Sequence, residues 1–369
     1  MEKVRIEDFI NYNYLGNLKI SPDEKYAAFI HIRGDKENDN YPGNIWVMDL
    51  ETHQSKQLTS GNSERNCIWY DHETLVFSGC RDTALKEKIA DKETWSIFYK
   101  MNIHGGEATE WFRIPMSVGS YEKINDHTMI ISASIRTDIK NFYECSSETE
   151  KAEYKKHMNS QKNYEWFDEI PFWSNGLNIT NAKRNCLFVL NTDTLEVTPI
   201  SDMYANASLQ HIKGNKVLYS SNPLKDVRVI PSSLHVYDVE TKEDITLVKD
   251  HEVSVNWAFF IKDKVITSLS SYETYGYHQH GTLYAFDQAG NKTKLVHFDN
   301  TYGAHLGSDC LQQFGNSLKA YNDIIYFSVA DENDGCMKCF DEDGNITQLS
   351  GYNGGIESFD ICSKGIYFI

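Results

Sequence analysis

The sequence predicts an all-β fold: a β-propeller of four-stranded antiparallel blades, of the seven-bladed type, with six full blades and two strands of an incomplete last one. Three observations support this prediction. One turn pattern occurs six times, pairs of strand-like segments precede its copies, and two more short strand-like runs end the chain. We therefore expect residues 1–369 to form a single β-propeller domain.

Each copy of the turn pattern ends an apolar run with Asp or Asn, and Thr or Gly follows three residues later. An Asp or Asn side chain at the first turn position accepts hydrogen bonds from the backbone ahead of it, and Gly or Thr closes the turn. Each copy is therefore predicted to be a β-hairpin. The six turn residues are Asp49, Asn102, Asn191, Asp238, Asp287 and Asp341.

Another pair of runs rich in β-branched and aromatic residues precedes each hairpin, although the sixth pair is less regular. Four strands per repeat follow from this arrangement. The turn residues recur at intervals of 53, 89, 47, 49 and 54 residues, close to the period of roughly 40–50 residues that is typical of propeller blades. A β-sandwich pair is the alternative with many short strands, but it does not predict one turn pattern six times.

The long interval holds an insertion in the third blade, at about residues 137–184. Its middle part is rich in Glu, Lys and Ala behind a candidate N-cap, Ser147, which predicts a short exposed helix ending near Gln161. The following stretch, "EWFDEIPFWSNG", places four aromatic residues around Pro171 and ends on an Asn-Gly turn. Two interpretations stay open: these aromatics close over the ring, or they face a ligand, with Trp173 as the candidate contact.

The chain ends on "SFDICSKGIYFI", two short apolar runs around the turn Ser363-Lys364-Gly365. We expect these runs to be the first two strands of a seventh blade. The other strands of that blade are then expected outside the 369 residues.

Charge and composition exclude several partner classes. The chain has 36 basic and 53 acidic residues and a net charge of −17, which disfavours nucleic acid and anionic membranes as partners. It has no apolar run of about 20 residues and no signal-peptide pattern. Its eight cysteines are scattered through strand-like segments, as in proteins of a reducing compartment, so we expect a cytoplasmic protein. The lone CxxC motif and the His278/His280 pair lack further ligands, and we expect neither a metal nor a cofactor.

Three phrases resemble the non-catalytic propeller of the prolyl oligopeptidase family of serine peptidases, in particular its acylaminoacyl-peptidase and dipeptidyl-aminopeptidase-like branch. "ISPDEKYAAFI" (20–30) resembles the family's first-blade phrase, with Glu24 where Gly is usual. "HGGEATEW" (104–111) resembles its Gly-Gly-Glu hairpin, and "DEIPFWSNGLNITNAKRNCLFVL" (168–190) resembles a segment of its bacterial members. The first two phrases also occur in TolB-like propellers.

The resemblance implies a peptidase parent that cleaves short peptides or acylated amino-terminal residues. In this family the propeller covers an α/β-hydrolase domain that follows it and carries a Ser-Asp-His triad. The nucleophile motif Gly-x-Ser-x-Gly does not occur in the 369 residues. We therefore expect this chain to lack catalytic residues and the catalytic hydrolase domain, to be inactive alone, and to have that domain and short peptides as its partners.

Candidate substrate contacts come from "GCRD" (79–82), which resembles a Ser-Arg-Asp sequence of related peptidases. Arg81 is a candidate to donate to a peptide carboxylate or carbonyl, and Asp82 and Trp173 complete the candidate set. The alternative for Arg81 is an ion pair with Asp82 or with a neighbouring blade.

Two functions remain open at this point. One is a substrate-gating domain of a serine peptidase. The other is a stand-alone TolB- or WD-repeat-like propeller that binds a protein or peptide partner, and such a module should complete all of its blades.

Overall fold

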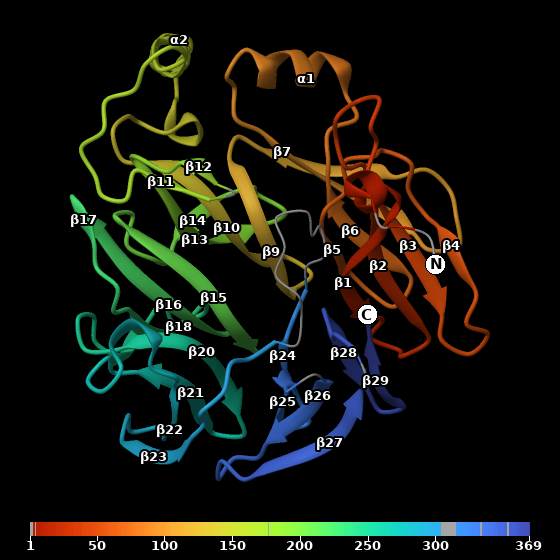
Figure 1. Ribbon diagram of the computed structural model, residues 1–369. Coiled ribbons are helices and arrows are strands. Elements are labelled where there is room, and N and C mark those ends of the chain that lie inside the picture. The colour runs from red at the N-terminus through yellow and green to blue at the C-terminus, as the bar shows by residue number, and fades with distance from the viewer. Residues whose placement is uncertain (1–2, 4, 176, 304–314, 333, 353) are drawn as a thin grey trace. The chain divides into compact units, whose positions relative to one another are not determined.

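The computed structural model describes residues 3, 5–175, 177–303, 315–332, 334–352 and 354–369. The chain forms two compact units, which we describe separately (Figure 1). Unit 1 contains Met1–Arg81, Ile97–Phe112 and Asn300–Ile369, and unit 2 contains Asp82–Ser96 and Arg113–Asp299.

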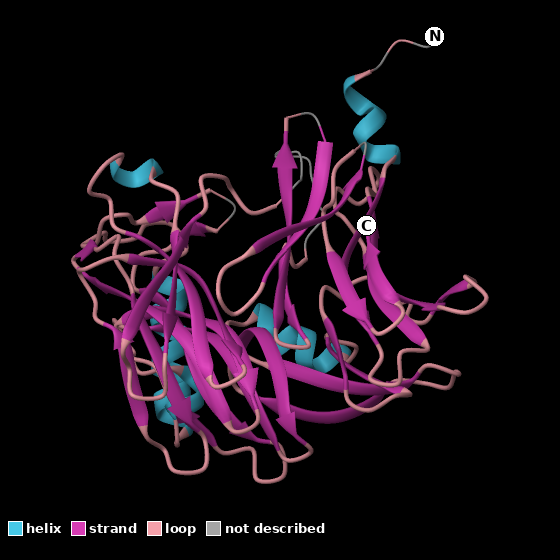
Figure 2. Cartoon of the chain, turned by 90° about the horizontal axis from the view of Figure 1, so that it is seen from below, coloured by secondary structure: helices cyan, strands magenta, loops and turns pink. Residues whose placement is uncertain are grey.

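The predicted β-propeller fold is confirmed, because the described residues form six antiparallel blades with a four-strand order (Figure 2). Strands that pair on both sides, such as β10 (Thr128–Arg136) and β21 (Lys264–Ser270), are almost continuously buried. Outer strands such as β4 (Ser55–Gln57) are exposed. This burial is what stacked small sheets produce, since each blade covers the faces of its neighbours while its edge strands keep contact with water.

Unit 1 contains the first, second and sixth blades, with the strand orders β1-β2-β3-β4, β5-β6-β7-β8 and β24-β25-β26-β27. A short 3-10 helix, η1 (Ile6–Asn11), precedes them. The remaining strands are β1 (Asn13–Ile20), β2 (Tyr26–Arg33), β3 (Gly43–Asp49), β5 (Cys67–Trp69), β6 (Thr74–Ser78), β7 (Ser96–Asn102), β8 (Thr109–Ile114), β24 (Leu318–Tyr321), β25 (Ile324–Asp331), β26 (Asp334–Phe340) and β27 (Ile346–Tyr352).

Unit 2 contains the third, fourth and fifth blades, with the orders β14-β13-β10-β9, β15-β16-β18-β19 and β20-β21-β22-β23. A short strand, β17 (Val227–Arg228), pairs with β16 beside the fourth blade. The other strands are β9 (Ser117–Asn125), β13 (Lys183–Asn191), β14 (Val197–Pro199), β15 (Ala205–Lys213), β16 (Lys216–Lys225), β18 (Ser233–Asp238), β19 (Asp244–Val248), β20 (Ser254–Ile261), β22 (Thr282–Phe286) and β23 (Lys292–His297).

Apolar clusters join neighbouring blades of unit 2. Ile130 and Leu187 of the third blade pack with Val217 of the fourth. Leu218 of the fourth blade packs with Ala258 of the fifth. Burial of each large aliphatic side chain stabilises the fold by about 1.5–3 kcal/mol, so the stacked faces provide the core.

The predicted turn chemistry is confirmed at all six positions. In every turn the side-chain oxygen of the Asp or Asn accepts the N–H of the residue two positions later, at 2.8–3.0 Å. In the turns that contain Gly, the Gly itself has a positive φ, for example 81° at Gly290. In the turns that contain Thr, the residue after the Thr has a positive φ instead, for example 61° at Lys242.

The blade-three insertion runs between β10 and β13 and contains η2 (Phe142–Glu144), α2 (Glu148–Ser160) and the hairpin of β11 (Trp173–Ser174) and β12 (Asn178–Ile179). The predicted helix is confirmed with its cap, because Ser147 accepts the N–H of Glu150 and forms a capping box with it. Gly176 of the predicted Asn-Gly turn lies outside the described residues.

The two predicted C-terminal strands are present as β28 (Phe359–Cys362) and β29 (Gly365–Phe368). They form a separate two-stranded sheet in the described part of the chain, so six blades are shown and a seventh is not. Within unit 1 this hairpin lies against the first blade, where Glu24 has a φ of 58°. The Glu24 carboxylate accepts the Ser363 backbone N–H at 3.0 Å and also the Ser363 hydroxyl.

The remaining features of the fold are its short helices and its cysteines. The structure also contains helices that the sequence did not predict: α1 (Thr83–Ala90) and the short 3-10 helices η1 and η3 (Gly276–His278). None of the helices in the described residues is both long and apolar enough to cross a bilayer. All seven cysteines in the described ranges are free thiols, and Cys310 lies outside those ranges.

Candidate functional site

Arg81 lies just after β6 in unit 1 and is held on three sides. Its Nη2 donates to Oε1 of the buried Glu64 at 3.1 Å. Its guanidinium carbon lies 5.3 Å from the centre of the Phe77 ring and 5.4 Å from that of Tyr99. The expected alternative of an ion pair is therefore present, but its partner is Glu64 rather than Asp82. The Arg81 side chain is still 36% exposed, so its neighbours restrict it but leave part of it accessible to a ligand.

Asp82 has a structural role at the start of a helix. Its carboxylate accepts the backbone N–H groups of Ala84 at 2.9 Å and Leu85 at 3.3 Å, which makes it the N-cap of α1. Arg113 lies 3.7 Å from the same carboxylate. A substrate contact of Arg81 or Asp82 stays a prediction.

Trp173 belongs to an exposed aromatic group on the insertion. Phe167 and Phe172 stack with ring centres 4.5 Å apart. The exposed fractions are 82% for Trp166, 53% for Trp173, 43% for Phe172 and 42% for Phe167. These rings are therefore available for contact in unit 2, and a ligand role of Trp173 stays a prediction.

The base of the insertion is anchored by a buried ion pair that sequence reasoning missed. Arg184 donates to both carboxylate oxygens of Glu169, at 2.7 and 3.0 Å, and its Nη2 also donates to the carbonyl of Leu224 at 2.8 Å. The side chains of Arg184 and Glu169 are only 2% and 9% exposed. No spacing rule links these three positions, so only the fold reveals the anchor.

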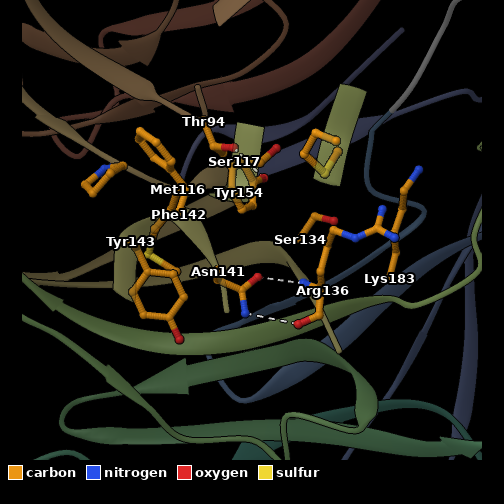
Figure 3. Close-up of a pocket in the computed structure, with 12 residues that line it drawn as sticks. Thr94, Met116, Ser117, Ser134, Arg136, Asn141, Phe142, Tyr143, Tyr154 and Lys183 are labelled. Atoms are coloured by element: carbon orange, nitrogen blue, oxygen red, sulfur yellow. Dashed lines mark hydrogen bonds between the residues drawn. The ribbon is translucent and has the colours of Figure 1, made fainter. Parts of the chain in front are cut away.

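A cavity of about 120 Å³ lies beside α2 and the third blade, entirely within unit 2 (Figure 3). Phe142, Tyr143 and Tyr154 supply aromatic wall, and Arg136 and Lys183 lie on the other side. Asn141 fixes the Arg136 backbone, because its Oδ1 accepts the Arg136 N–H at 2.6 Å and its Nδ2 donates to the Arg136 carbonyl at 3.0 Å.

An ionic network ties α2 to the strand that lines this cavity. The Asp138 carboxylate accepts two hydrogen bonds of 2.7 Å from Arg136 and lies 2.9 Å from Nε2 of His157. Burial alone would raise the pKa of Asp138, but its hydrogen bonds with Arg136 and His157 outweigh burial and hold the pKa below the usual value. Burial raises the pKa of Tyr143 to about 12, so its phenol stays protonated at neutral pH.

The size and lining of this cavity limit the ligands and reactions that it could support. It is smaller than typical ligand sites of about 300–1,000 Å³, and the described residues that line it include no histidine to activate Ser117 or Ser134. It can accommodate one small side chain of a ligand or of this chain. The described residues contain no group of three or more His, Cys, Asp or Glu placed to hold a metal ion, and His280 instead lies 3.0 Å from Asp299.

Comparison with known proteins gives matches among solved structures. No protein-family model and no curated protein matches the sequence. The acylaminoacyl peptidase of Pyrococcus horikoshii is similar with a TM-score of 0.65 and 13% identity, covering 97% of this chain and 49% of that one. An acylaminoacyl peptidase in complex with Z-Gly-Gly-Phe-chloromethyl ketone is similar with a TM-score of 0.67 and with the same identity and coverage. A third match is the β-propeller domain of the Trilobed protease from Pyrococcus furiosus, which has an open velcro topology. Its TM-score is 0.57 and its identity 10%, over 96% of this chain and 88% of that chain.

These matches establish the fold. The chain spans about half the length of the acylaminoacyl peptidases that it matches, at 49% of each. The predicted resemblance to the propellers of these peptidases is therefore confirmed at the level of structure: the chain has the β-propeller fold found in acylaminoacyl peptidases and in the Trilobed protease.

Proposed function

We propose that this chain is the non-catalytic, substrate-gating propeller of a cytoplasmic serine peptidase of the prolyl oligopeptidase family, in its acylaminoacyl-peptidase or dipeptidyl-aminopeptidase-like branch. One observation carries the proposal: the likeness covers 97% of this chain but 49% of the acylaminoacyl peptidase. The three phrases at 20–30, 104–111 and 168–190 support the same family. In this proposal residues 1–369 act as one propeller domain.

The role of the propeller is to admit short peptides and to exclude folded proteins, while an α/β-hydrolase domain supplies the catalytic triad. Size selection needs a narrow passage and no catalytic residue in the propeller. The hydrolase domain would then cleave short peptides or acylated amino-terminal residues.

We include β28 and β29 in this proposal as the two inner strands of a seventh blade. Within unit 1, β28 contacts both β24 of the sixth blade and β1 of the first. Met337 of the sixth blade packs with Phe359 and Ile361 of β28. Contacts with a blade on each side support the assignment of this two-stranded sheet to a further blade.

Among the candidate contacts, Arg81 is the best prepared to meet a peptide. Glu64 and the rings of Phe77 and Tyr99 restrict its side chain, so binding of a carbonyl or carboxylate would cost little conformational entropy. Trp173 offers an exposed ring to an apolar side chain. Asp82 would act indirectly, through the start of α1.

The test is purification of the protein from its native cells through a chromosomal tag, followed by mass spectrometry and labelling with a fluorophosphonate serine probe. We expect a hydrolase sequence with Gly-x-Ser-x-Gly in the same polypeptide or in a stoichiometric partner, and labelling of that sequence. The recombinant 369-residue chain should stay unlabelled. Labelling of that chain, or native protein that contains no hydrolase sequence, would contradict the proposal and favour the stand-alone binding module.

A further inference from the structure

A second, larger pocket lies between the fourth and fifth blades, within unit 2. Its volume is about 420 Å³, within the range of about 300–1,000 Å³ that is usual for small-ligand sites. Most of its wall consists of hydroxyl and amide side chains, including those of Asn206, Ser208, Asn256 and Gln279. Its only charged side chain among the described lining residues is Arg228. In a chain with 53 acidic and 36 basic residues, a pocket wall without a carboxylate favours an anionic ligand.

The side chain of Arg228 is held in place by Asn222. The Asn222 amide nitrogen donates to the carbonyls of Val229 at 2.5 Å and Pro231 at 2.7 Å, which fixes the orientation of the amide. Its Oδ1 then accepts the Arg228 Nε–H at 3.3 Å. The two Nη groups of Arg228 have no partner among the described residues, so they remain available to a ligand.

The backbone of Arg228 is held by the blade-three insertion. Arg228 lies on β17, and its N–H donates to the carbonyl of Ile170 at 2.8 Å. The Ile170 N–H donates in turn to the carbonyl of Asp226 at 2.8 Å. The adjacent Glu169 is paired with Arg184, which also binds the carbonyl of Leu224 on β16. The buried anchor and the pocket arginine are therefore parts of one assembly.

The fifth blade contributes an acceptor to the pocket wall. Nδ2 of Asn256 donates to the hydroxyls of Ser268 and Ser270, each at 3.1 Å, which leaves its Oδ1 without a partner in the described structure. Gly281 permits this close packing, because a Cβ at that position would collide with Ser268 and Asn256. The pocket that Arg228 lines therefore also contains an amide oxygen, held in orientation by its neighbours, that is suited to a ligand N–H group.

We propose that this pocket binds the carboxyl terminus of a short peptide, an inference that rests on the proposed function and specifies its substrate class. The free Nη groups of Arg228 fit a carboxylate in a bidentate pair. Ser208 and the amides of Asn206 and Asn256 can exchange hydrogen bonds with the last peptide groups. A hydroxylated acid such as a sugar acid presents related chemistry, and the test separates the two.

The test is isothermal titration calorimetry on the 369-residue chain with N-acetyl-trialanine, its C-terminal amide and gluconate. We expect the free acid to bind about 10- to 100-fold more tightly than the amide, as for a hydrogen-bonded ion pair. Arg228→Gln should remove this difference, and Arg228→Lys should retain part of it. Arg33→Gln, at the exposed end of β2, is the matched control and should bind as the unchanged chain does.

Equal binding of acid and amide, tighter binding of gluconate than of the peptide, or no binding of any of the three would overturn the proposal. Circular dichroism of both Arg228 variants checks that they are folded, and Arg228 is exposed enough to make this the expected result. The purification test of the proposed function does not depend on this pocket. A hydrolase partner found without peptide binding here would refute only the pocket assignment.

Discussion

The six repeated hairpins and the blade-three insertion are held together in opposite ways. Each hairpin turn is stabilised by hydrogen bonds between residues at most four positions apart. For example, the Asp287 carboxylate accepts the Ala289 N–H at 2.9 Å and the Asn291 N–H at 2.8 Å. The insertion depends on distant partners: Arg184 reaches Leu224, 40 residues away, and Lys155 reaches Asp91, 64 residues away. Local hydrogen bonds therefore stabilise each hairpin independently of the others, whereas the position of the insertion depends on a few ionic contacts.

The largest effect should come from the buried anchor of the insertion. Arg184→Ala leaves the Glu169 carboxylate buried without a counter-charge, which should lower the free energy of unfolding by about 3–5 kcal/mol. Urea denaturation measures this change. Lys151→Ala is the control, because its pair with the exposed Glu148 should contribute about 0.5 kcal/mol or less. A loss below 1 kcal/mol for Arg184→Ala, on the order of a surface pair, would show that the two regions do not differ in this way.

The turns themselves can be tested by exchanging the residues at positive φ. Gly290→Ala introduces a Cβ at a φ of 81°, where no atom lies within 4 Å of it, so the cost is conformational and should be about 1–2 kcal/mol. Lys242→Gly removes a side chain at a φ of 61° and should change stability by between zero and a gain of about 1 kcal/mol. Thermal unfolding of both variants gives the sign. Two losses of similar size would disprove the strain argument.

The cap of α2 should have a local effect. Ser147→Ala removes the acceptor for the Glu150 N–H, and the helix should lose about 1 kcal/mol. Hydrogen exchange of the amides in Glu148–Ser160 should then accelerate by about fivefold for a loss of that size, with the six hairpins unchanged. Ser160→Ala, at the other end of the helix, should leave exchange at the first turn as it was.

Acidification should produce the smallest effect. The hydrogen bond from Lys140, followed by those from Ser146, lowers the pKa of Glu150 from 4.5 to about 2. Because the folded-state pKa is the lower one, the contribution of Glu150 is complete above about pH 4.5 and is lost as the pH falls towards about 2. The stability difference between the unchanged chain and Glu150→Gln should therefore shrink over this interval. A difference that stays constant down to pH 2 would argue against the bonds of Glu150 as its cause.

Local signals explain what the sequence could predict. The six Asx turns, the cap of α2 and the β28–β29 hairpin each depend on residues within a few positions of one another, and all are present. Helix α1 also has a local signal, the N-cap Asp82, but the same residue is a candidate substrate contact in the sequence. A carboxylate after a strand fits both tasks, and the sequence does not distinguish them.

The site could be predicted only in part. Arg81 was identified, but its partner Glu64 lies 17 residues earlier and no spacing links them. No motif points to Arg228, because the bonds that hold it come from Ile170 and Asn222 on different segments. Ion pairs and pocket walls join residues that are distant in sequence, so they become visible only when the strands have been placed.

Glu24 shows how one position can serve two opposed requirements. Its φ of 58° favours glycine, yet its carboxylate holds Ser363 and its carbonyl accepts the Lys364 ammonium at 2.9 Å. Exchange for glycine would relax the first blade's turn and, in the same step, remove the carboxylate that binds Ser363 in the hairpin at the other end of the sequence. Substitutions at positions 24 and 363 should therefore be epistatic, and the backbone preference alone does not determine which residue at position 24 stabilises this chain most.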